Sequence, residues 1–183
     1  MRGNEKKGGA MTGTMAKGPK QLFSEAFERE HATTLRVLRA FPDDQSDFKP
    51  SEKAKTAREV VWTLVLGQER LMLKALTTGF DWSAPRTPPP AAPATVSAAA
   101  AALDRVHGQV RDVLRDFDES ALSKETVRFF VAPKTQGDVP KLEFLWFLLF
   151  DHVHHRGQFS VYLRMVEGKV PSIYGPSADE PWT

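Results

Sequence analysis

Apolar side chains recur every three or four residues in four long segments of this chain, as in helices that bury one face. The segments are residues 19–41, 56–78, 95–117 and 140–167. In the first of them the spacing of four, three, four and three joins Phe27, His31, Thr34, Leu38 and Phe41. Four such segments predict an all-α fold, a four-helix bundle.

The second segment differs from the others because it is apolar almost all round. Thr56 and Glu59 have the spacing of a capping box at its start, and Gly79 is a natural stop at its end. A surface helix has one apolar stripe, so this helix must be covered on more than one side. The cover comes either from the rest of the bundle or from a second chain.

The segments between the helices predict the connections. Residues 80–94 contain five prolines, which favour a stiff extended segment over a helix. This segment is long enough to cross over the bundle, so we expect a Pro-rich crossover between helices two and three. Residues 118–140 are irregular, with one short extended stretch at 127–131.

The charge of the chain belongs mainly to its first residues. The whole sequence of 183 residues carries a formal charge of +2, and residues 1–18 hold four basic residues and one acidic residue. The remaining residues therefore sum to −1, which gives no basic face for nucleic acid. We expect residues 1–18 to be a disordered basic leader and 19–183 to be a single domain. No apolar run is long enough for a membrane span or a secretory signal.

The sequence contains no cysteine. This excludes disulfides, thiolate metal sites and a cysteine nucleophile, and it fits the reducing cytoplasm, where we expect the protein. Any metal site must be built from imidazole and carboxylate groups.

Three of the five histidines lie close together near the middle of the fourth segment. Asp151 and His155 are four residues apart, and a stripe through Phe144, Leu148 and Tyr162 would include both of them. A carboxylate and an imidazole in an apolar stripe need a partner. One interpretation is a site for zinc, nickel, iron or manganese, and the other is a hydrogen-bonded pair without an ion.

The other histidines are candidates for completing such a site. His31 lies on the apolar stripe of the first segment, where it is either a third ligand or a core histidine. His154 is a further candidate ligand, and His107, beside Gly108, is interpreted as a surface residue. Gly157 costs a helix about 1 kcal/mol relative to alanine. It therefore indicates close approach of a backbone or a ligand at this point.

The C-terminal part of the chain resembles the DinB (DinB/YfiT-like) family. The resemblance lies in the segment HHRGQFSVYLR at residues 154–164, continues through VPSIYGPSADE at 170–180, and includes the opening of the second helix at 56–62. It implies a four-helix bundle with a long crossover, often a homodimer. It also implies a zinc or nickel ion held by three histidines, one from helix two and two from helix four. Relatives include thiol-dependent transferases, isomerases and metal-dependent hydrolases.

This chain departs from that ligand pattern at two of three positions. His155 matches the second ligand of helix four, Asp151 stands at the first, and Thr63 stands where helix two supplies its histidine. The third ligand would have to be His31, His154, Glu69 or water.

Two functions follow as hypotheses. The first is a divalent-metal-dependent hydrolase or transferase acting on a small-molecule substrate, with Asp151, His155, His154 and His31 as metal ligands. The second is a non-catalytic protein of the same fold that has lost the metal and binds a small ligand or only a partner chain. In both we expect a homodimer.

Overall fold

The computed structural model describes residues 16–183, so most of the expected leader at 1–18 lies outside the described residues. The main helical elements are α1 (Pro19–Arg39), α2 (Ala57–Gly67), the π-helix η2 (Gln68–Met72), α3 (Leu73–Leu76), α4 (Val96–Asp116) and α6 (Lys141–Met165). The minor elements are η1 (Asp43–Gln45), α5 (Glu119–Lys124), β1 (Thr126–Ala132) and β2 (Thr135–Pro140). The mostly helical content predicted from the sequence is therefore correct.

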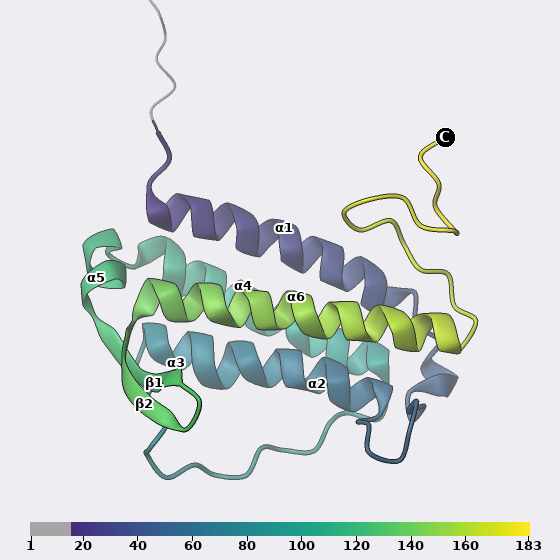
Figure 1. Cartoon of the computed structure of the whole chain (residues 1–183), viewed down its shortest axis with the longest axis horizontal. Helices are drawn as coiled ribbons and strands as arrows, with labels where there is room; N and C mark the ends of the chain where they lie inside the picture. Colours follow the sequence, from purple (N-terminus) through teal and green to yellow (C-terminus); the bar gives the residue numbers. More distant parts are fainter. Residues whose placement is uncertain (1–15) are drawn as a thin grey trace, which may run out of the picture.

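The long helices lie side by side (Figure 1). α1 and α2 each pack against both α4 and α6. The second predicted helix is continuous, but η2 interrupts its regular α-helical hydrogen bonding between α2 and α3. It begins as expected, because Thr56 and Glu59 form the capping box.

A two-stranded antiparallel sheet corrects the all-α prediction. β1 contains the extended stretch at 127–131, and β2 pairs with it from Thr126 opposite Pro140 to Ala132 opposite Thr135. The turn between the strands places Lys134 at a φ of 62°. The polar sequence of β2 has no alternation of apolar residues, and only the pairing with β1 makes it a strand. The hairpin caps one end of the helices, where Phe129 packs on Phe144 of α6.

A layer of polar side chains divides the interior into two apolar clusters. One cluster joins the C-terminal half of α1 to α2, the start of α4 and the end of α6. The other joins the start of α1 to α3, the end of α4, the hairpin and the start of α6. Each long helical segment carries buried polar residues between its two apolar parts; these are Glu30, Gln68, His107, His152 and Arg156.

The Pro-rich connection between α3 and α4 lies along the outer side of the second helical segment. The indole nitrogen of Trp62 donates to the carbonyl oxygen of Pro90 at 2.8 Å. Arg70 donates to the carbonyl oxygens of Thr87 at 2.8 Å and Pro88 at 3.3 Å. The cover that the apolar sequence of this helix requires therefore includes a segment of the same chain. Among residues 16–183, none of the helices is long and apolar enough to cross a membrane.

Candidate functional site

The buried face of α6 is not the face predicted from the sequence. Beyond Lys141 at its start, its polar members are His152, at 6% exposure, and Arg156, at 1%. Asp151 and His155 lie at the edge of this face, and their side chains are 41% and 21% exposed. The stripe proposed through Asp151 and His155 is therefore wrong by one residue. Either phase accommodates the neighbouring apolar residues, because α6 is apolar over most of its circumference in its first half.

Asp151 and His155 do meet, as their spacing predicts. The Nε2 atom of His155 lies 3.6 Å from a carboxylate oxygen of Asp151. Gln158 holds the other side of the imidazole, with its Oε1 atom 3.1 Å from Nδ1 of His155. The same amide places its Nε2 atom 2.9 Å from Nε2 of His154, which lies on the exposed surface. His154 is therefore turned toward Gln158 and solvent.

His31 is turned toward α4 and does not join this pair. Its Nε2 atom donates to a carboxylate oxygen of Asp104 on α4 at 2.9 Å, and its ring stacks on that of His107. Thr63, at the helix-two position, accepts a hydrogen bond from the ammonium group of Lys55 at 2.7 Å. His31 is therefore engaged by residues of α4, and the hydroxyl oxygen of Thr63 carries a cation.

The side chains available therefore do not fit a divalent ion held by three histidines. Within residues 16–183, no group of three or more histidine and carboxylate side chains is arranged to hold a metal ion. Of the four proposed ligands, Asp151 and His155 face each other, whereas the ring of His154, 5.4 Å from that of His155 between centroids, is turned toward Gln158. A pair of ligands leaves most of a tetrahedral or octahedral coordination sphere to other donors.

A cleft of about 500 Å³ opens beside Asp151, between the second helical segment and the Pro-rich connection. Thr63, Leu66, Gly67, Arg70 and Lys74 form its helical wall. The facing wall comes from residues 80–89 and includes Phe80, Trp82 and Arg86. The cleft combines apolar and aromatic walls with a few charged groups, which is typical of sites for small molecules.

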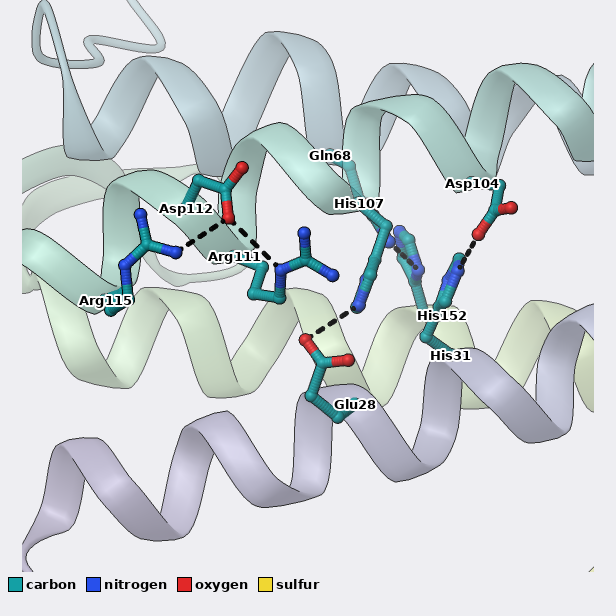
Figure 2. A network of polar contacts seen from close by, with 9 residues as sticks. All are labelled: Glu28, His31, Gln68, Asp104, His107, Arg111, Asp112, Arg115 and His152. Carbon is teal, nitrogen blue, oxygen red and sulfur yellow. Dashed lines mark hydrogen bonds and ion pairs between the residues drawn. The ribbon is translucent and has the colours of Figure 1, made fainter.

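A network of polar contacts between the helices was not predicted from the sequence (Figure 2). His107, interpreted above as a surface residue, is 2% exposed, and its Nε2 atom donates to Glu28 of α1 at 3.1 Å. Gln68 of η2 approaches Nδ1 of His152 at 3.5 Å. Gly67 was the one sequence feature that could have indicated the buried position of His152, because its missing side chain leaves space for the His152 ring against helix two. Gly157, in contrast, has no atom of the described chain near its missing Cβ.

Burial sets the protonation of this network. It lowers the pKa of His107 and of His152 to about 3, and nearby histidines act in the same direction. Burial also lowers the pKa of His31, against the opposing effect of Asp104. The interior histidines are therefore neutral at pH 7, and they add no charge to the core.

A second buried contact ties the C-terminal segment to the helices. Arg156 donates to a carboxylate oxygen of Glu30 at 2.8 Å and to the hydroxyl oxygen of Tyr174 at 2.6 Å. Burial opposes ionisation of Glu30, but hydrogen bonds from Tyr174 and Arg156 lower its pKa. The arginine of the HHRGQ segment therefore has a structural partner in α1.

The sequence profile of the DinB superfamily matches residues 26–159, and the chain belongs to this superfamily. Solved structures show the same fold. A DinB-like protein from Bacillus cereus ATCC 10987 is 22% identical, with a TM-score of 0.68, over 83% of this chain and 95% of that one. A DinB-like protein from Bacillus subtilis is 17% identical, with a TM-score of 0.62, over 82% and 95%.

A conserved protein from Enterococcus faecalis is 20% identical, with a TM-score of 0.53, over 82% of this chain and 98% of that one. No match was found among curated proteins. At these identities the solved structures identify the fold, and the function has to be argued from the site.

Proposed function

We propose that this chain is a DinB-fold protein that binds a small molecule in the cleft beside Asp151 and does not use a divalent metal held by three histidines. In this proposal the fold is the four-helix bundle of the family, with residues 77–95 as its crossover. The lack of cysteine supports a cytoplasmic location.

The observation that carries this proposal is the composition of the cleft. Thr63 and Asp151, which occupy two of the family's metal-ligand positions, both line it. The hydroxyl oxygen of Thr63 accepts from Lys55, and Asp151 faces His155 at 3.6 Å. A cavity of this volume is ample for a small organic molecule, whereas the donors suited to a transition metal are too few.

The metal part of the proposal is tested by zinc and nickel titration of protein purified without a nickel column. We expect less than one ion per chain at micromolar metal. Thr63→His combined with Asp151→His supplies the missing imidazoles and should gain one ion per chain. Thr63→Ser is the matched control, which should gain none.

A divalent-metal-dependent hydrolase or thiol-dependent transferase is the second candidate. The observation in its favour is the partly exposed pair of Asp151, which lines the cleft, and His155. Stoichiometric metal in the unaltered protein, lost in Asp151→Ala and in His155→Ala, would establish this candidate in place of the first.

The ligand part is tested with N-phenyl-1-naphthylamine, an uncharged fluorescent probe of apolar sites. Ala84 lines the cleft, and Ala84→Trp should reduce probe binding at least fivefold by filling it. Ala91→Trp is the control, because Ala91 is exposed on the same connection and does not line the cleft. Equal binding by both variants would contradict a ligand site in this cleft.

The same protein is proposed to be a homodimer that pairs through the outer face of α6. Four apolar side chains are exposed along this helix; they are Phe147, Phe150, Val161 and Met165. Between Glu143 and Arg164 the fully exposed positions of α6 carry no acidic or permanently basic group, and the one partly exposed acid is Asp151, which lines the cleft. Exposed apolar surface of this extent favours a partner, and the open space at Gly157 would allow a second helix to approach closely.

A further inference from the structure

The cations of the cleft distinguish it from a purely apolar site. Arg70, Lys74 and Arg86 all line it. Within residues 16–183 none of the three forms an ion pair with a carboxylate. Arg70 donates to two backbone carbonyl oxygens, and Arg86 lies over the ring of Trp82 with its guanidinium carbon 3.9 Å from the ring centroid. Lys74 is exposed.

The two carboxylates of the cleft are already engaged. Asp81 accepts hydrogen bonds from the backbone nitrogen of Ser83 at 2.7 Å and from its hydroxyl group at 2.6 Å. Asp151 faces His155. The three cations therefore outnumber the two acids, and neither acid neutralises a cation.

Aromatic and apolar surface lies next to these cations. Phe80 and Trp82 pack edge to face with ring centroids 6.3 Å apart, and both line the cleft together with Leu66 and Leu71. A flat apolar molecule can stack on such rings, while an anionic group on the same molecule can reach the ammonium and guanidinium groups.

We propose that the cleft selects a small amphipathic anion, with an aromatic or apolar body against Trp82 and Phe80 and a carboxylate, sulfonate or phosphate near Lys74 and Arg86. This inference rests on the proposed function, since it concerns the ligand of the same cleft. The excess of unpaired positive charge attracts an anion, and the partly apolar surroundings strengthen that attraction relative to bulk water.

The inference is tested with two fluorescent probes that share the arylaminonaphthalene body. One is 1-anilinonaphthalene-8-sulfonate, which carries an anionic group, and the other is the uncharged N-phenyl-1-naphthylamine. We expect the anionic probe to bind with at least tenfold lower Kd at low salt. Sodium chloride at 0.5 M should remove most of this difference, because exposed charges are screened.

Charge-removing variants locate the effect. Lys74→Gln and Arg86→Gln should each raise the Kd of the anionic probe about three- to tenfold and leave that of the uncharged probe within twofold. Lys124→Gln removes an exposed lysine of α5 that is not part of the cleft, and it should change neither. Ala84→Trp should weaken both probes.

The outcomes separate this inference from the proposed function. If both probes bind equally and the charge variants change neither, the selection of anions is wrong while the cleft remains a ligand site. If Ala84→Trp changes neither probe, the proposed ligand site is itself wrong, and the inference fails with it.

Discussion

Gly67 of α2 lies directly against the ring of His152 of α6. A Cβ atom at residue 67 would be 3.1 Å from Nε2 of His152, closer than ordinary van der Waals contact. The absence of a side chain at this point lets the two helices approach with an imidazole between them. The polar layer therefore depends on a glycine in the middle of helix two.

This contact predicts opposite effects for the same substitution at two helical glycines. In the monomer, Gly157→Ala should raise the free energy of unfolding by about 0.5–1 kcal/mol, because alanine favours the helix and its methyl group meets open space within the single chain. Gly67→Ala should lower it by about 1 kcal/mol, since overpacking against His152 exceeds the gain in helix propensity. Urea denaturation measures both. A stabilising Gly67→Ala would show that the helices separate there without cost.

The buried histidines predict a loss of stability in acid. Their pKa in the folded state is about 3, well below the unfolded value near 6.5. Between these values the unfolded chain binds more protons, so the free energy of unfolding should fall as the pH drops from about 6.5 toward 3. The slope should approach 1.4 kcal/mol per pH unit for each of His107 and His152.

The acid dependence is measured by urea denaturation at a series of pH values. His107→Gln and His152→Gln should each flatten the profile below pH 6. His154→Gln removes an exposed histidine and serves as the control, with an unchanged profile expected. A profile that neither core substitution alters would disprove the role of these residues in acid unfolding.

The Glu30–Arg156 pair predicts strong coupling between α1 and α6. Arg156→Met should cost about 3–5 kcal/mol, because it leaves the buried Glu30 carboxylate without its cation. Glu30→Met combined with Arg156→Met should recover much of this loss. A double-mutant cycle by thermal unfolding gives the coupling energy, and additive single effects would mean that the two charges do not depend on each other.

The outer face of α6 predicts the behaviour of the protein in light scattering. The unaltered chain should have the mass of a dimer at tens of micromolar, and Phe150→Lys should shift it to the monomer. Leu22→Lys introduces the same charge at an exposed apolar residue of α1 and should leave the mass unchanged. A monomer at all accessible concentrations would contradict the proposed pairing.

Helix positions could be predicted from the sequence because periodicity and capping residues act locally. The capping box of Thr56 and Glu59 starts α2 where expected, and Pro19 begins α1. β2 could not be predicted, since its polar residues become a strand only by pairing with β1. The π-helix η2 could not be predicted either, because a single turn whose hydrogen bonds reach one residue further along the chain leaves no clear mark in an apolar sequence.

The candidate site was harder to predict because it depends on the rotation of α6. Rotating α6 by one residue position changes which pair it buries: the prediction buried Asp151 and His155, and the structure buries His152 and Arg156. The apolar residues around them fit both phases, and only the packing against α1 and Gly67 decides between them. The pairing of Asp151 with His155 was nevertheless predicted, since it depends on spacing within one helix.

The polar layer described above has a consequence for the alignment of the helices along their axes. Sliding α6 by one turn relative to its neighbours would move His152 and Arg156 against leucine and phenylalanine side chains. Both would lose their hydrogen bonds in an apolar environment, at a cost of several kcal/mol. Leucine-rich surfaces alone tolerate such sliding more readily. The polar layer therefore fixes the position of α6 along its axis, and it keeps Asp151 in the wall of the cleft.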